Sequence, residues 1–76
     1  MEKVLRQVSG MDTKAPHLIR AWLQAEGRKV LWLADQVQVD RSTASQWLSG
    51  NRIPLPSHRA RLASVTGLDI AGAEAW

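Results

Sequence analysis

Apolar side chains recur at helical spacing along most of the chain, and short polar stretches separate one series from the next. The first clear series predicts a helix over residues 16–26, since Pro16 suits a first helical turn and Gly27 suits a left-handed helix end. One broad side of this helix is therefore expected to be buried. Its apolar face should comprise Leu18, Trp22 and Ala25, flanked by Ile19 and Leu23.

Two shorter series follow, separated by a three-residue corner. They predict helices over residues 30–37 and 41–49, with Val39 closing the angle between them and Asp40 capping the second. Trp32 lies off the main apolar face, so it either covers the preceding helix or marks a surface for a partner. The buried positions are expected to be Val30, Leu33, Ala34 and Val37 in one helix and Ala44, Trp47 and Leu48 in the other.

The opposite face of the helix over 41–49 is polar and short in side-chain reach. A helix that is merely solvated usually carries pairs of Glu and Lys, and none occurs here. This surface is therefore expected to lie close against another molecule. It consists of Arg41, Ser42, Ser45, Gln46 and Ser49, with Thr43 at its edge.

The C-terminal third predicts one more helix and a tail. Residues 54–56 form a stiff link, after which Ser57 is expected to cap a helix over 57–66 and Leu55 to pack as its hydrophobic staple. The inner face of that helix should be Leu62, Ala63 and Val65. In the tail, Ile70, Ala73 and Trp76 align at three-residue intervals and form either a lid on the core or a self-association patch.

Size and composition favour an all-α fold, a compact four- to five-helix bundle with a helix-turn-helix motif. The chain has 76 residues, which is one small domain, and no cysteine, so apolar packing has to stabilise it. We expect an N-terminal arm over 1–14, a helix-turn-helix domain over 15–68, and a tail over 69–76 with a possible dimer contact. The arm is either a short helix or extended, and either partly ordered or in contact with DNA or a second copy.

The chain shows no apolar leader and no apolar run near the ~20 residues that a membrane span needs. A cytoplasmic protein without a membrane partner is the resulting expectation.

Positive charge is concentrated in one segment. Residues 41–61 contain four arginines (Arg41, Arg52, Arg59 and Arg61) and no Asp or Glu, within a chain of net charge +3. A basic segment on a near-neutral body is typical of a surface that binds phosphates, although small domains also acquire uneven charge by chance. Arg59 and Arg61 are either solvated surface charges, the interpretation that we favour, or weaker candidates for phosphate contacts.

Two short helices joined by a tight corner fit the helix-turn-helix arrangement. The second helix of that motif inserts into a DNA major groove about 12 Å wide, so bulky residues on its face would hold it away from the bases. Ser42, Ser45 and Gln46 can hydrogen-bond base edges, and Arg41 can pair with guanine or with phosphate.

At these residues the chain resembles the Cro and phage-repressor (XRE) family of helix-turn-helix proteins. The resemblance covers about residues 16–70 and is carried by the segments Leu33-Ala34, Gln38-Val39-Asp40, Arg41-Ser42-Thr43-Ala44-Ser45-Gln46-Trp47, Gly50-Asn51-Arg52-Ile53-Pro54, Leu62-Ala63 and Gly67-Leu68. It implies base reading by Arg41, Ser42, Thr43, Ser45 and Gln46. It implies phosphate contacts by Lys29, Asn51 and Arg52, to which we add Arg28 and Ser49.

The chain departs from the family pattern at three places. Gln38 replaces the corner glycine, so a left-handed backbone there would be slightly strained. Lys29 and Val30 replace the polar cap and glutamine that open the first helix of the motif, and Val30 cannot contact phosphate. Ala44 is smaller than the usual branched residue, leaving space for Trp47 or Trp32.

Other chemistry has little support. His17 and His58 lack the spacing of metal ligands, and Ser57, His58 and Asp69 are no hydrolase triad without a nucleophile elbow. No Gly-rich phosphate loop occurs. We expect no enzyme, no cofactor, no metal and no small-molecule ligand.

The sequence therefore predicts a sequence-specific duplex-DNA-binding regulator, a Cro-type repressor that binds an inverted-repeat operator as a homodimer. Ile70, Ala73 and Trp76 are the expected dimer residues. The alternative is a protein-interaction module with weak or no specific DNA binding. Single-stranded nucleic acid is a third option, but the chain lacks aromatic residues interleaved with basic ones.

Overall fold

Four α-helices and a 3₁₀ turn make up residues 14–76, the part of the chain that the computed structural model describes. No strand occurs among these residues, so the expected all-α fold with its paired short helices is confirmed. The predicted arm falls outside the described residues except for Lys14. The elements are α2 (Ala15–Glu26), α3 (Val30–Val37), α4 (Arg41–Leu48), α5 (Pro56–Thr66) and the 3₁₀ turn η2 (Ala73–Ala75).

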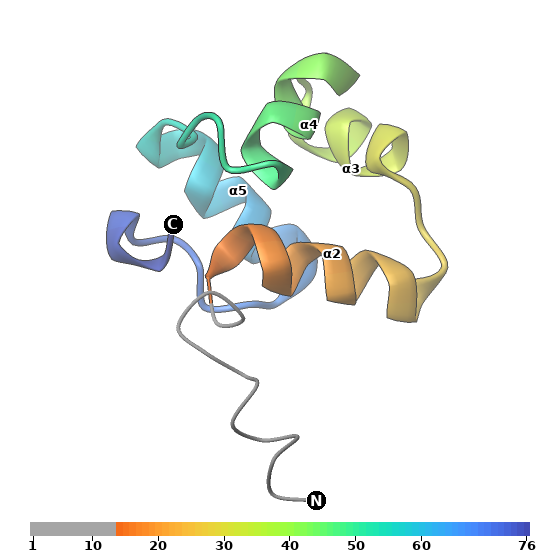
Figure 1. The fold of residues 1–76 in the computed structure, drawn as a ribbon, viewed down its shortest axis with the longest axis horizontal. Helices are drawn as coiled ribbons and strands as arrows, with labels where there is room; N and C mark the ends of the chain where they lie inside the picture. The colour runs from red at the N-terminus through yellow and green to blue at the C-terminus, as the bar shows by residue number, and fades with distance from the viewer. Residues whose placement is uncertain (1–13) are drawn as a thin grey trace, which may run out of the picture.

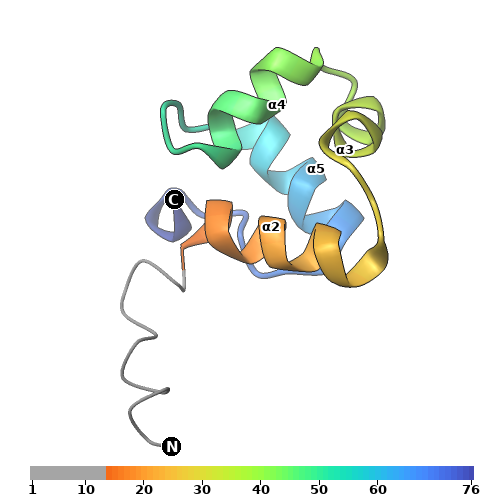
Figure 2. The ribbon, with the colours of Figure 1, turned by 45° about the vertical axis from the view of Figure 1, so that its right-hand side comes forward.

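The helices form two sides around one core. Figures 1 and 2 show α2 along one side of the molecule and the α3–α4 pair along the other. α3 packs against both α4 and α5, and α2 packs against α4. The turn η2 lies near the start of α2 in both views, so the end of the chain covers that side of the core.

One hydrophobic cluster holds these elements together. The largest fully buried side chains are Ile19 from α2, Leu33 from α3, Leu62 from α5 and Ile70 from the tail. Helix α4 adds Ala44, Trp47 and Leu48, as the sequence predicts. Because every helix contributes, the exposed face of α4 stands on a continuous core.

The corner between α3 and α4 is left-handed at Gln38, which has φ 64° and ψ 50°. Gln38 is the only non-glycine residue with positive φ among residues 14–76, and its backbone is strained because its Cβ crowds the following carbonyl. The amide of Val39 donates to the carbonyl oxygen of Ala34 at 3.0 Å and turns the chain out of α3. Val39 packs against the core, as expected of the residue that closes the angle.

The buried face of α2 differs from the predicted one. It is centred on Ala15, Ile19 and Leu23, whereas Ala25 is exposed. These three residues repeat every four positions and so lie along one side of the helix, where they meet the core. Trp22 and Leu18 are only half-buried at the margin.

The start of α5 also differs. The helix begins at Pro56, with Leu55 as its N-cap residue, so the prediction that Ser57 caps it is wrong. Proline is well suited to this first position, because its fixed φ matches the helix and its missing N–H would have no partner there. Leu55 is 64% exposed and is no hydrophobic staple. On the inner face, Leu62 and Thr66 are buried, whereas Ala63 and Val65 are half-buried.

Within residues 14–76, the helices are too short and too polar for any of them to span a lipid bilayer.

Candidate functional site

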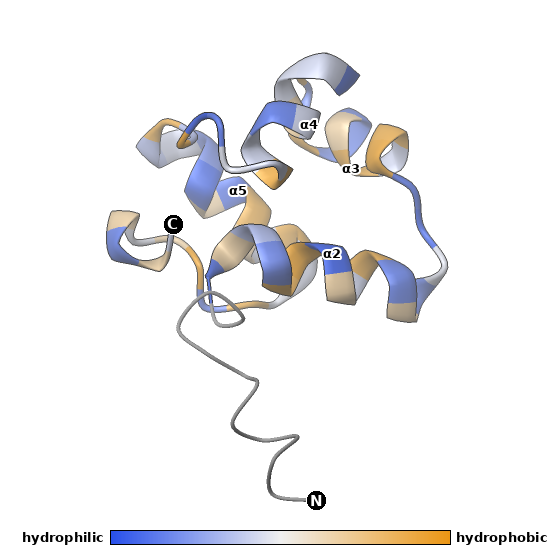
Figure 3. Cartoon of the chain, in the orientation of Figure 1, coloured by the Kyte–Doolittle hydropathy of each residue, from blue (hydrophilic) through white to orange (hydrophobic). Residues whose placement is uncertain are grey.

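Helix α4 presents a polar face to solvent and an apolar face to the core. Figure 3 shows this helix as mainly white and blue beside the more apolar α3. Because α-helices repeat every 3.6 residues, the buried Ala44, Trp47 and Leu48 leave one contiguous exposed arc. That arc consists of Arg41, Ser42, Ser45, Gln46 and Ser49, with Thr43 half-buried at its edge, as the sequence predicts. It contains no carboxylate.

The C-terminal end of α4 is fixed by hydrogen bonds from two sides. Arg20 on α2 donates its Nε–H to the carbonyl oxygen of Leu48 at 3.1 Å. Ser49 is the C-cap residue of α4, and its hydroxyl donates to the carbonyl oxygen of Gln46 at 3.1 Å. The amide of Asn51 donates to the same oxygen at 3.0 Å. The helix is thereby held against α2.

The N-terminal end of α4 is less restrained. Asp40 occupies the N-cap position, as predicted, but its side chain makes no capping hydrogen bond. The exposed Arg41 follows it directly, so the first cation of the exposed face lies next to a carboxylate just outside that face.

Two cations lie in the connection between α2 and α3. Arg28 places its guanidinium carbon 4.4 Å from the centre of the Trp32 ring, which is a cation–π contact. Trp32 in turn stacks on Trp22, with ring centres 5.9 Å apart and 30° between the planes. Trp32 therefore covers α2, the first of its two predicted roles. Lys29 is exposed at the N-cap position of α3.

A second group of polar residues follows α4. Asn51 and Arg52 are both exposed, and they precede Ile53 and Leu55, which are 59% and 64% exposed. His58 packs against the buried Trp47, with ring centres 5.2 Å apart. Of the predicted phosphate residues, Arg28 and Lys29 lie in the α2–α3 connection and line a hollow with Leu48 of α4, and Ser49, Asn51 and Arg52 follow the C-terminal end of α4.

The expected solvent exposure is confirmed for Arg61 but is wrong for Arg59. Arg59 is half-buried and donates to two carbonyl oxygens, of Ala71 at 2.9 Å from Nε and of Pro54 at 2.8 Å from Nη1. Arg61 is exposed but donates from Nε to the carbonyl oxygen of Gln36 at 3.2 Å. Both arginines tie α5 to neighbouring segments.

The expected dimer residues are placed differently from one another. Ile70 is fully buried and offers no surface to a partner, so this part of the prediction is wrong. Its side chain enters the core because the chain turns back after α5. Ala73 is exposed, and Trp76 is half-buried with its indole N–H donating to the carbonyl oxygen of Ile70 at 2.9 Å. Trp76 therefore acts as a lid, one of the two predicted roles of the tail.

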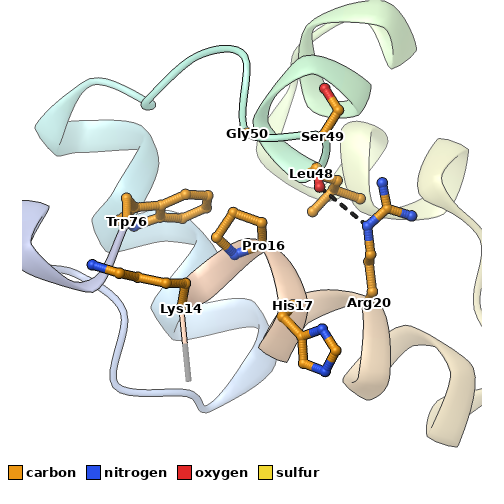
Figure 4. A pocket seen from close by; sticks show the side chains of 8 residues that line it. All are labelled: Lys14, Pro16, His17, Arg20, Leu48, Ser49, Gly50 and Trp76. Atoms are coloured by element: carbon orange, nitrogen blue, oxygen red, sulfur yellow. Dashed lines mark hydrogen bonds between the residues drawn. The ribbon is translucent and has the colours of Figure 1, made fainter. Parts of the chain in front are cut away.

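Within residues 14–76 no three His, Asp or Glu side chains are close enough together to hold a metal ion. A hollow of about 330 Å³ lies at the C-terminal end of α4, where Arg20, Leu48 and Ser49 line one part and Trp76 another (Figure 4). Sequence reasoning did not identify Arg20, because its role depends on a contact between residues 28 positions apart.

Comparison of the chain with protein families, with curated proteins and with solved structures found no match. Function therefore has to be inferred from the geometry and chemistry of the site.

Proposed function

We propose that this chain is a sequence-specific duplex-DNA-binding transcriptional regulator of the Cro and phage-repressor kind that its sequence resembles. The observation that carries the proposal is the exposed face of α4. It is polar and free of carboxylates, three of its five residues are serines, and exposed cations occur in the segments before α3 and after α4. Such a face can approach base edges closely. A typical solvated helix, whose surface carries Glu and Lys, could not.

In this proposal α4 lies in the major groove. Gln46 offers both a donor and an acceptor and can form a bidentate pair with adenine, and Arg41 can form one with guanine. Ser42 and Ser45 are exposed between them and are short enough to leave the helix close to the bases. Each well-formed bidentate contact would discriminate against a wrong base by ~1–3 kcal/mol.

Phosphate contacts would come from two segments of the chain. Arg28 and Lys29 would contact phosphates from the α2–α3 connection, and Ser49, Asn51 and Arg52 would contact them from the segment after α4. These contacts fix register and make affinity depend on salt, but they carry little sequence information.

Regulation would follow from occupancy of an operator, in the cytoplasm and without a small-molecule ligand. One reading helix covers only a few base pairs, so a homodimer on an inverted repeat is expected, with half-sites ~34 Å apart.

The test is selection of bound duplexes from a random pool at fixed salt, followed by titration of two matched double variants. Arg41→Ala with Gln46→Ala should weaken binding to the selected duplex by at least tenfold and leave binding to random duplex nearly unchanged. Arg61→Ala with Gln36→Ala removes the same residue types from α5 and α3 and should leave discrimination intact. If the first variant still distinguishes the two duplexes, α4 is not the reading helix.

A protein-interaction module is the second candidate, and one surface of α3 favours it. Leu31 is 56% exposed and, with Trp32, lines a hollow of about 400 Å³. A selection that enriches no duplex, together with capture of a protein partner lost in Leu31→Asp, would support this candidate over DNA binding.

A further inference from the structure

Helix α2 carries a cation that faces the end of α4, in a hollow of about 590 Å³. Arg20, Arg28 and Lys29 line this hollow, and every other side chain lining it is uncharged. Three cationic residues therefore line one surface depression, and no carboxylate does; the guanidinium of one of them, Arg28, lies over Trp32 at the neighbouring hollow. An anion is the ligand that such an arrangement favours.

Arg20 is held in place while keeping donors available. Its Nε–H is bonded to the carbonyl oxygen of Leu48, which fixes the plane of the guanidinium. The two terminal nitrogens of the same fork are further donors, and Figure 4 shows them beyond the bonded Nε, at the end of α4. Arg59, by contrast, uses both Nε and Nη1 on carbonyls of its own chain. Arg20 is thus a preorganised cation.

The hollow adjoins the C-terminal end of α4. Arg20 and Leu48 also line the neighbouring hollow of about 330 Å³, to which Ser49 belongs. On the far side of the α2–α3 connection, Arg28 and Lys29 line a third hollow together with Asp35. That acid lowers the attraction for an anion there, so the preferred side is the one with Arg20.

We propose that Arg20, with Arg28 and Lys29, forms a phosphate-binding site that takes a backbone phosphodiester of the duplex read by α4. This inference rests on the proposed function and deepens it, since it adds α2 to the DNA-contacting elements. The bond to Leu48 then couples the phosphate contact to the position of the reading helix.

The test compares Arg20→Gln with Arg61→Gln, which also removes one arginine bonded through Nε to a backbone carbonyl but lies outside the hollow. Arg20→Gln should lower the slope of log Kobs against log salt by about 0.9 and weaken specific and random duplex alike. Arg61→Gln should leave the slope unchanged. Equal changes in both variants, or none in Arg20→Gln, would overturn the site.

Arg20→Lys separates charge from helix positioning. Lysine keeps the positive charge but lacks the planar guanidinium, so this variant should retain the wild-type dependence of log Kobs on log salt. It should do so even if its thermal midpoint is lowered as much as that of Arg20→Gln. A slope that drops equally in Arg20→Lys would show that Arg20 acts only by positioning α4, and would overturn the phosphate contact.

Titration of the wild-type chain with inorganic phosphate tests the site without DNA. The NMR signals of Arg20 Nε–H and of the Leu48 and Ser49 amides should shift, and Arg20→Gln should abolish the amide shifts. If phosphate shifts these NMR signals but the chain binds no duplex DNA, the anion site is supported and the proposed function is refuted. Duplex binding with an unchanged Arg20→Gln slope would refute this inference and leave the function standing.

Discussion

Three arginines in this small fold donate hydrogen bonds to backbone carbonyls that lie outside their own helices. Arg20 reaches Leu48, Arg61 reaches Gln36, and Arg59 reaches both Pro54 and Ala71. A chain of this size has few apolar residues to join its elements, and charged donors strengthen such bonds. Sequence reasoning counted Arg59 and Arg61 within a basic segment. Hydrogen bonds between residues far apart in the sequence leave no local signal. The sequence therefore overestimates how many arginines are free to bind a phosphate.

Replacing Arg59 by methionine should lower the free energy of unfolding by about 1–3 kcal/mol. The change keeps an apolar stem but removes both hydrogen bonds, one of them to the carbonyl of the buried Pro54. Urea unfolding followed by helical circular dichroism measures this. Arg61→Met removes one exposed bond and should cost less than about 1 kcal/mol. Equal losses in the two variants would show that the two bonds of Arg59 stabilise the fold no more than the single bond of Arg61.

Gln38→Gly should stabilise the chain by about 1 kcal/mol. A left-handed residue with a Cβ costs roughly 1–2 kcal/mol, and the greater freedom of glycine in the unfolded chain offsets part of the gain. The thermal midpoint should rise by about 4–8 °C. Gln38→Ala keeps the Cβ and serves as control, so an equal rise in that variant would contradict strain relief as the cause.

At the scale of elements, periodicity predicted some features well and others poorly. The bounds of α3 and the two faces of α4 were predictable, because an eight-residue amphipathic helix has only one way to bury its apolar arc. The face of α2 was not, since Trp22 drew the predicted centre away from Ile19. The start of α5 depended on whether Pro56 or Ser57 opened the helix, and both are common there.

Ala44→Leu should destabilise the chain by about 1–3 kcal/mol. Ala44 is fully buried in α4, so three added carbons have to displace neighbouring core side chains. Ala21→Leu makes the same change at an exposed position of α2 and should stay within about 0.5 kcal/mol of the wild type. Thermal unfolding of both variants checks the difference. A tolerated leucine at 44 would mean that α4 packs loosely.

At the scale of the whole molecule, the two ends of the described chain meet. Figure 4 shows Trp76 beside Pro16 near the start of α2, and Trp76 packs against the core. The pattern of the tail predicted either a lid or a self-association patch, and sequence alone could not decide, because both roles need the same apolar residues. The bond from Trp76 to Ile70 indicates the lid.

Trp76→Ala should therefore lower the free energy of unfolding by about 1–3 kcal/mol, less than for a fully buried tryptophan. Its state of association should not change, which sedimentation equilibrium of variant and wild type can measure. Trp76→Phe keeps an aromatic ring but loses the indole donor, so its free energy of unfolding should lie between those of Trp76→Ala and the wild type. A changed association constant with unchanged stability would instead place Trp76 in a contact between copies.

The stack of Trp22 and Trp32 under Arg28 gives the molecule an optical reporter. Indole emission depends on nearby charge, and the Arg28 guanidinium lies 4.4 Å from the Trp32 ring. A bound phosphate that attracts Arg28 would change the charge above that ring, while Trp47 stays enclosed in the core. In the proposed complex, fluorescence of the unlabelled chain would then register contact with the DNA backbone separately from the proposed contacts of α4 with the bases.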